Sequence, residues 1–397
     1  MPNTRLKAAR LAAGYHSQQA LADALQVGVR QVRRWESDQP PTPGPEVAQA
    51  LVRVLGQDLG ALGFPQEGSA PVRRTVLMAV GLAAVPTQAV AVQPATAADD
   101  YEAVTRSHRR LYWSVAPATL QPAAIAHATL GCAMLPQAAG QTRQRIAAAL
   151  AETYLLAGRI EFFDMRDADR AQQTMLRALQ AAGEANDPLL GAAVLAHMAF
   201  IPAWDGDREA AVERMVASRT YARRGPASAE LLAWLDAVEA ECETRCGNTR
   251  AALHLIGHAE DVLADGGDYS SPAWLDWFSS VRLAAFKGNT QLKAGHLPQA
   301  RATLLAVLDA LDPAEEKQQT VVLGDLAAVE AAADDPDAAC GYALRALDQL
   351  ERTWYAMGMD RVREVRRALA PHQHAPCVRE LDDRLYGWST TVSALAR

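Results

Sequence analysis

Hydrophobic positions near the start of the chain recur at helical spacing in short runs separated by turn residues. In the run after Ser17, a favourable helix N-cap, Leu21 and Leu25 lie one turn apart on the same side. After a turn of three residues, a second run places Val32 and Trp35 on one side. The pattern therefore predicts two short helices, joined by a tight turn, whose apolar sides pack together.

The polar side of the second predicted helix carries three arginines. At 100° per residue, Arg30, Arg33 and Arg34 project away from the apolar side. The chain as a whole has 39 basic and 46 acidic side chains and a formal net charge of −7, whereas its first 64 residues hold seven Lys or Arg against five Asp or Glu. Such a helix is typical of a surface that binds a polyanion, although charge alone fits the solvated face of an ordinary helical hairpin equally well.

The order of residues in this segment resembles the Cro/repressor-like (XRE) helix-turn-helix family. The family pattern is Ser/Thr-Gln-x-x-Leu-Ala, a short turn, then Val-x-x-Trp-Glu, and the chain has SQQALADALQVGVRQVRRWES. The matching positions are Gln18, Leu21, Ala22, Val27, Val32, Trp35 and Glu36. The resemblance covers residues 3–64 and implies binding to double-stranded DNA, with the second helix in the major groove.

The resemblance also implies which side chains contact DNA. The implied contacts are Gln18, Val29, Arg30, Gln31, Arg33 and Arg34, with the second glutamine at the margin of the surface. Val29, Arg30 and Arg34 would reach base edges, and Arg33 would bind phosphate or a base. Gln18, at the start of the first helix of the motif, would contact backbone phosphate, and a base is its second candidate contact.

Other positions of the family pattern concern stability and assembly. Arg10 and Glu36 match a structural ion pair of the family, and Asp38 stands where a glycine often ends the recognition helix. The following QPPTPGP would end the helix instead. Because three arginines make a modest electrostatic surface, we expect a homodimer on a two-fold operator.

Length and composition indicate several domains of helical type. A chain of 397 residues exceeds one ordinary core, alanine is abundant, and strand-like alternation is rare. The five cysteines are an odd number in a large chain, and MPNTRLKAARLAAG lacks the apolar core of a signal peptide. We therefore expect an all-α, reduced, cytoplasmic protein.

Residues 65–100 differ in character from the segments around them and are predicted to be a linker. They contain RRTVLMAVGLAAV, which looks like a twin-arginine export signal but is internal. The apolar stretch 76–92 is interrupted by Pro86 and is shorter than the roughly 20 residues of a membrane span. We expect no membrane contact and interpret this stretch as a buried helix that bridges the two domains or packs between subunits.

From residue 101 to residue 397 the chain shows paired helices. Small residues recur seven positions apart in the second helix of each pair, which lets a neighbouring helix approach closely. The pairs are Ala171 and Ala178, Ala210 and Ala217, Ala252 and Ala259, Ala300 and Val307, and Ala339 and Ala346. The pattern predicts an α-solenoid and resembles degenerate tetratricopeptide (TPR) repeats, although no unit has the full signature.

A solenoid offers a concave surface to an extended partner or a small ligand. Together with the helix-turn-helix segment at residues 3–64, this architecture resembles regulators whose TPR body dimerises and senses a peptide or a small molecule. The alternative is a DNA-tethered scaffold that recruits a partner protein. The candidate ligand contacts are aromatic residues expected on first helices: Trp204, Trp234, Trp274, Trp277 and Trp354. Core packing is the competing explanation for each of them.

Two groups of residues have the composition of a metal site, but neither is predicted to bind a metal ion. Cys242, Cys246, His254 and His258 have spacing that suggests zinc, but the predicted hairpin does not bring all four together. HQHAPC at 372–377 is interpreted as a loop between helices. The basic run 361–367 is a candidate to hold DNA or another anionic partner, but Asp360 and Glu364 at pairing distance favour a solvated helix face. No phosphate-binding glycine motif, nucleophile elbow or His-Glu-x-x-His pair is present, so neither catalysis nor a cofactor is predicted.

Overall fold

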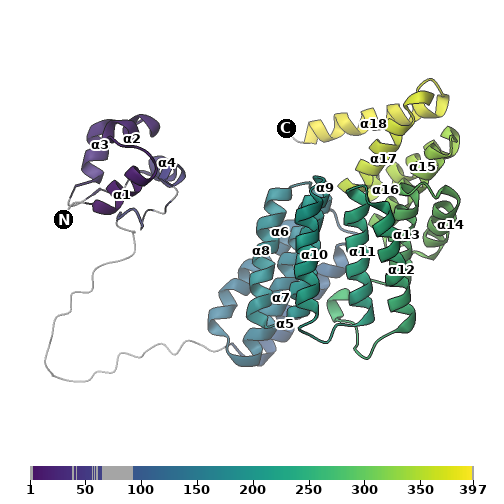
Figure 1. The fold of residues 1–397 in the computed structure, drawn as a ribbon, viewed down its shortest axis with the longest axis horizontal. Coiled ribbons are helices and arrows are strands. Elements are labelled where there is room, and N and C mark those ends of the chain that lie inside the picture. The colour runs from purple at the N-terminus through teal and green to yellow at the C-terminus, as the bar shows by residue number, and fades with distance from the viewer. Residues whose placement is uncertain are drawn as a thin grey trace. The chain divides into compact units, whose positions relative to one another are not determined.

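The computed structural model describes residues 3–395 except residues 38, 39, 42, 56, 58, 60 and 65–92. Every regular element in this part of the chain is a helix (Figure 1). The chain divides into two compact units, whose described residues fall within 3–64 and 93–395. We call the first unit the head and the second the body. The apolar stretch 76–92 and the helix stop at Asp38 lie outside the described residues.

The head contains α1 (Thr4–Ala12), α2 (Gln18–Ala24), α3 (Val29–Trp35) and α4 (Pro45–Leu55). Ser17 caps α2 through a hydrogen bond from the Ala20 amide, as its position predicts. The turn before α3 passes through Gln26 in the left-handed region, at φ 53°. Helices α2 and α3 thus form the predicted pair with a short turn between them.

The body begins earlier than the sequence pattern indicates. Helix α5 (Ala95–Leu111) starts inside the predicted linker, and Ala98 and Tyr101 belong to the body core. The next helices are α6 (Pro117–Met134) and α7 (Gly140–Arg159), followed by one π-helical turn, η2 (Ile160–Asp164). No helix of the described residues is long and apolar enough to cross a membrane.

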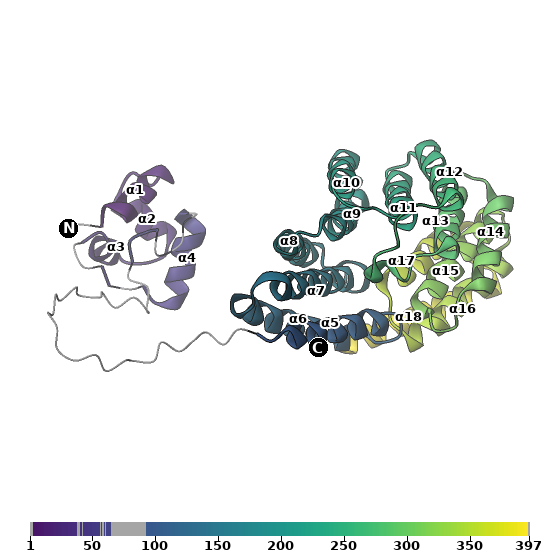
Figure 2. The ribbon, with the colours of Figure 1, turned by 90° about the horizontal axis from the view of Figure 1, so that it is seen from below.

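The rest of the body consists of antiparallel helices packed in sequence (Figure 2). Their bounds are α8 (Ala168–Ala185), α9 (Pro188–Trp204), α10 (Arg208–Ala222), α11 (Ala229–Arg245), α12 (Thr249–Asp265), α13 (Ser280–Lys293), α14 (Leu297–Ala310), α15 (Glu316–Ala332), α16 (Pro336–Arg352), α17 (Ala356–Ala368) and α18 (Pro376–Leu395). Short 3-10 turns are η1 (Leu135–Gln137), η3 (Ala273–Leu275) and η4 (Ala370–His372).

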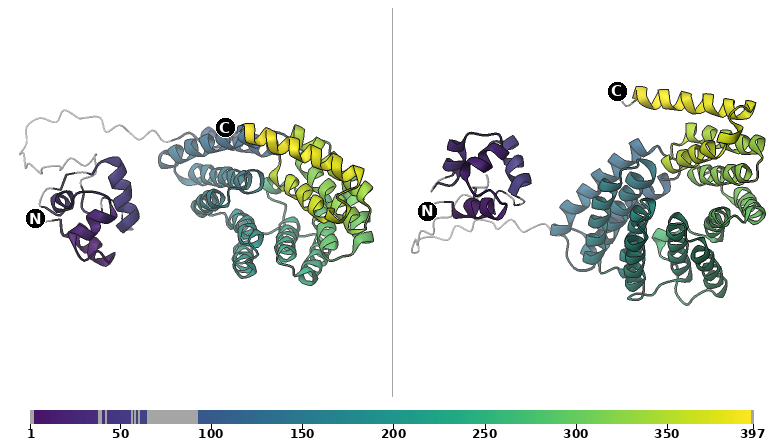
Figure 3. Two further views of the ribbon diagram at one scale, coloured as in Figure 1. Left: turned by 90° about the horizontal axis from the view of Figure 1, so that it is seen from above. Right: turned by 45° about the horizontal axis from the view of Figure 1, so that its top comes forward.

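The helices of the body form an inner and an outer layer (Figure 3). The odd-numbered helices from α7 to α17 contact one another in succession and form the inner layer, while each even-numbered helix from α8 to α16 packs behind its own partner. This arrangement is that of an α-solenoid, and it brings one face of every inner helix toward a common concave side.

The small residues of the outer helices lie at helix–helix contacts as predicted, except in α10, where the predicted pair is wrong. The alanines at 171, 178, 252, 259, 300, 339 and 346 are fully buried, but Ala210 and Ala217 are only half-buried. In α10 the buried pair is Ala211 and Ser218. The predicted register is therefore wrong by one residue in this unit. Asp207 caps α10, and the first buried small residue follows four positions after the cap, as it does after Asp167 in α8.

Candidate nucleic-acid interface and body cavity

Helix α3 is anchored to the head by its apolar side. Val32 and Trp35 are almost fully buried in a core with Leu6, Leu21 and Leu51. The Trp35 ring also meets the Phe64 ring edge to face, with centroids 6.2 Å apart. This packing fixes the rotation of α3 about its own axis.

The fixed rotation turns the arginines outward. Arg30, Gln31, Arg33 and Arg34 are all exposed, as the helical spacing predicts. Val29 differs from the other predicted contacts because it is half-buried and packs against the core. The guanidinium groups therefore stand on a solvent-facing surface whose orientation depends on the core beneath it.

A buried hydrogen-bond network joins three helices behind this surface. The Arg10 Nε atom lies 2.8 Å from Glu36 Oε1, and its Nη1 donates to the Tyr15 carbonyl oxygen at 2.7 Å. The ion pair that the family resemblance implied is thus confirmed. Gln18 Nε2 donates to Glu36 Oε2 at 2.6 Å, so one end of its amide orients the motif. Its predicted contact with DNA phosphate stays a prediction.

Asn3 makes a second set of hydrogen bonds within the head, which the sequence pattern did not indicate. Its Nδ2 atom donates to the carbonyl oxygens of Trp35 and Leu62, at 3.1 and 2.9 Å. Its Oδ1 atom accepts from the Leu6 amide and caps α1. A side chain near the N-terminus therefore fixes the end of α3, through contacts between positions too far apart in the chain for any local motif to indicate.

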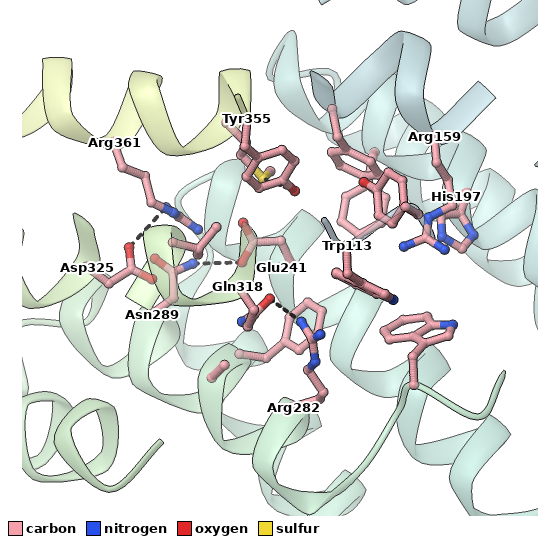
Figure 4. A pocket seen from close by; sticks show the side chains of 18 of the residues that line it. Trp113, Arg159, His197, Glu241, Arg282, Asn289, Gln318, Asp325, Tyr355 and Arg361 are labelled. Atoms are coloured by element: carbon pink, nitrogen blue, oxygen red, sulfur yellow. Dashed lines mark hydrogen bonds and ion pairs between the residues drawn. The ribbon is translucent and has the colours of Figure 1, made fainter. Parts of the chain in front are cut away.

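The body contains a cavity on the inner side of its helices (Figure 4). Its wall is formed by the end of α5, the π-helical turn after α7, and side chains of α7, α9, α11, α13, α15 and α17. About 120 Å³ of the cavity is open to groups the size of a water molecule. Aromatic, charged and amide side chains together line this space.

The structure brings some of the predicted tryptophans to this cavity and not others. Trp204, Trp234 and Trp277 line it, and Trp274 lines a smaller adjoining cavity. Trp354 packs against Trp388 and donates its indole N–H to the Asp164 carbonyl, and it is not among the lining residues.

The expected placement on first helices is also corrected. Trp274 lies in the turn η3, and Trp277 and Trp354 lie between helices, because Ser279 and Tyr355 are the N-caps of α13 and α17. Only two of the five predicted contacts are on the first helices of their pairs.

Several charged and polar side chains of the cavity were not predicted. Arg361 was expected on a solvated face, but it is buried and its Nη1 atom lies 3.1 Å from Asp325 Oδ1. Gly324 makes this approach possible, since a Cβ atom there would lie 2.8 Å from the Arg361 Cβ. Nearby, Asn289 Nδ2 donates to Glu241 Oε2 at 2.7 Å. A single charge run in sequence cannot indicate which of its arginines turns inward.

Burial changes the proton affinities of two side chains in this wall. It lowers the pKa of His197 to about 3, and the positive charge of Arg159 acts in the same direction. It also raises the pKa of Asp325 to about 6, against the opposing attraction of Arg361. His197 is therefore neutral near pH 7, whereas Asp325 is ionised.

The side chains weighed as zinc ligands lie apart from this cavity. Cys242 is buried, Cys246 is half-buried, and His254 and His258 are exposed. The Nδ1 atom of His258 lies 2.7 Å from Asp236 Oδ2. Within the ranges that the structure describes, no group of three or more His, Cys, Asp or Glu could hold a metal ion.

Comparison with known proteins assigns the head. Residues 6–62 match the family model described as Helix-turn-helix, and this match spans α1 to α4. The head is therefore a helix-turn-helix domain of the XRE type, a class of domain found in DNA-binding transcription regulators, and it is followed by a helical body. No curated protein matches the chain.

Proposed function

We propose that the protein is a cytoplasmic, non-enzymatic transcription regulator that binds a two-fold DNA operator as a homodimer and receives a signal through its body. The observation that carries this proposal is the surface of α3, where three arginines are exposed on a helix whose other side is locked into the core of a helix-turn-helix domain. Planar guanidinium groups in such a position suit guanine edges and phosphates.

Within this proposal, Arg30, Arg34 and the edge of Val29 read bases. Arg33 and Gln18 hold the DNA backbone, and the remaining predicted contact, Gln31, lies at the margin of the surface. A single copy of so small a basic surface would bind weakly, and two copies on two half-sites would remedy this.

We further propose that the body, residues 101–397 with the helix that begins at Ala95, is a TPR-like receiver of a peptide or a small molecule. The cavity on the inner side of α7 to α17 supports this assignment, because aromatic rings and a few polar and charged side chains converge there on space that protein atoms leave open. The cavity also favours a ligand sensor over a scaffold that only recruits a protein.

The proposal is tested by selecting bound duplexes from a random pool with the full chain at fixed salt. A two-fold motif should emerge, and Arg34→Ala should weaken binding to it by about 1–3 kcal/mol and relax the preference at one position in each half-site. Arg53→Ala is the matched control, since Arg53 is an exposed arginine of α4 in the same domain. Recovery of no motif, or equal effects of the two substitutions, would reject the proposal.

A further inference from the structure

One cation of the body cavity forms no ion pair with any residue that the structure describes. Arg159, the last residue of α7, forms none of the ion pairs or hydrogen bonds found among the described residues, and its Nε atom is buried without a partner. The nearby Asp164 carboxylate pairs instead with Lys317, whose Nζ lies 2.6 Å from Asp164 Oδ1, while Asp164 Oδ2 has no hydrogen-bond partner among the described residues. Arg159 lies within electrostatic range of Asp164 but makes no direct ion pair with it, so its half-buried guanidinium can still bind an anion from a ligand.

Aromatic rings surround the Arg159 guanidinium. Its central carbon lies 4.8 Å from the centroid of the Tyr112 ring, 5.8 Å from that of Trp113 and 5.1 Å from that of Trp277. Rings at these distances stabilise a cation and exclude water, but they leave its N–H donors without acceptors. The rings thus orient the guanidinium without neutralising it.

The other two arginines of the cavity differ from Arg159 in this respect. Arg282 has its Nη1 and Nη2 atoms 2.5 Å from Gln318 and Glu315 oxygens, and Arg361 is paired with Asp325. Their Nε atoms are buried without a partner in the described part of the chain, as that of Arg159 is, so the ion pairs are what distinguish them. Both are held by side chains of α15 or of the residue that precedes it. Arg159 is therefore the arginine of this cavity that is left to bind an anion from outside.

The space next to Arg159 suits an apolar group. Trp113 and Trp234 each lie 6.1 Å from Trp277 between ring centroids, at tilted or perpendicular angles, so the rings form a wall rather than a closed stack. Phe200 lies farther along the same cavity, 5.6 Å from Trp204. An aromatic or aliphatic group can lie against this wall, because edge and face contacts are both available.

A polar group lies on the opposite side of the cavity from Arg159 (Figure 4). Asn289 is almost fully buried and donates to Glu241, while its Oδ1 atom is buried and accepts no hydrogen bond among the described residues. An unused acceptor of this kind matches an N–H or O–H donor on a ligand.

We infer that the body cavity binds an organic carboxylate with an aromatic or other apolar body, whose carboxylate pairs with Arg159. A guanidinium and a carboxylate can form two parallel charge-assisted hydrogen bonds, which are stronger than hydrogen bonds to a neutral acceptor. The inference deepens the proposed function, on which it rests, by giving the chemical class of the signal. Two sources share this chemistry: a free aryl or alkyl acid, and the C-terminus of a short hydrophobic peptide.

The test uses the full-length chain and isothermal titration calorimetry at pH 7.5. The probes are indole-3-propionate and its primary amide, and a tripeptide ending in phenylalanine with a free or an amidated C-terminus. At least one acid should bind at least about tenfold more tightly than its amide, because the amide cannot form a charged pair. The acid that binds more tightly identifies the source.

Arg159→Met should abolish the difference between acid and amide while the cavity keeps its apolar wall. Arg223→Met is the matched control, because Arg223 is an exposed arginine at the end of α10, and this variant should bind as the wild type does. If circular dichroism shows that Arg159→Met is unfolded, the neutral variant Arg159→Gln replaces it, and the acid–amide comparison in the wild-type chain remains decisive.

Equal affinity for acid and amide, an undiminished difference in folded Arg159→Met, or no binding of either acid up to about 10 mM, well above the usual range for a specific ligand, would overturn the inference. DNA binding is measured on the same preparations. Acid binding without sequence-specific DNA binding would retain the cavity assignment and reject the proposed function, and the reverse result would reject only the cavity assignment.

Discussion

The head and the body each carry arginines at the sites proposed to bind an anion, but in opposite environments. On α3, Arg30, Arg33 and Arg34 are exposed to water around a helix that is anchored from behind by Trp35. In the body, Arg159 stands half-buried among aromatic rings. The difference is one of solvent as much as of charge.

This difference in exposure to water limits which anion each site can bind. Exposed guanidinium groups are screened by salt and gain from a long, regular polyanion that engages several of them together. An enclosed guanidinium acts at lower dielectric, where one ligand charge in one geometry decides affinity. The first environment suits DNA, and the second suits a small, singly charged molecule.

The largest expected effect comes from removing the anchor of the exposed surface. Trp35→Ala should destabilise the head by about 3–5 kcal/mol, because a fully buried indole is lost from a small core. DNA binding should disappear with it, while calorimetric binding in the body cavity is unchanged. Chemical denaturation followed by circular dichroism measures the change, with Gln31→Ala as the exposed control. A head that unfolds at the same denaturant concentration as the wild type would contradict the assigned anchor.

A second prediction concerns the helix pairs that support the cavity. Ala211→Leu should destabilise the body by about 1–3 kcal/mol, because the larger side chain overpacks the α9–α10 interface. Ala210→Leu, one position away and half-buried, should cost clearly less. Thermal unfolding of the two variants compares them, and the opposite order would restore the register that the spacing of seven first suggested.

The enclosed environment should also make the body sensitive to acid through His197. Its pKa is about 3 in the folded chain and about 6.5 when unfolded, so the unfolded chain takes up the proton first as pH falls below 6.5. Stability is therefore lost toward low pH. His197→Gln should remove about 1.4 kcal/mol of the loss between pH 7.5 and 5.5. Urea unfolding at the two pH values measures this, and an unchanged loss in the variant would contradict the buried, neutral imidazole.

The smallest expected effect separates phosphate binding from base reading on α3. Arg33→Gln should weaken all duplexes similarly and reduce the slope of log affinity against log salt by about one, because one fewer phosphate is neutralised. Arg34→Ala should instead affect the selected duplex most. Binding titrations at several salt concentrations compare the two, and a loss of sequence preference in Arg33→Gln would assign that arginine to base reading.

The head could be predicted from sequence because its signals are local. The cap at Ser17, the turn before α3 and the opposed sides of Val32 and Arg34 all lie within about 20 residues, and a family resemblance added the Arg10–Glu36 pair. The hydrogen bonds from Asn3 to the Trp35 and Leu62 carbonyl oxygens could not be predicted, because they join positions far apart in the chain.

The body was predicted less completely because its site is assembled from distant helices. Spacing of seven fits both Ala210 with Ala217 and Ala211 with Ser218, and only the distance from the Asp207 cap decides between them. Three predicted tryptophans line the main cavity, yet nothing local marks Arg159 as unpaired. Among the described residues Arg159 forms no ion pair of its own, while the nearby Asp164 carboxylate is paired with Lys317 from α15.

The most direct test of the central claim, that the exposed arginines of α3 are the DNA contact, is phenylglyoxal modification of the full chain, mapped by mass spectrometry with and without the selected duplex. Arg30, Arg33 and Arg34 should react in the free chain and be protected by the duplex, whereas Arg159 should react to the same extent in both. Undiminished reactivity of the three α3 arginines in the DNA complex would contradict this claim.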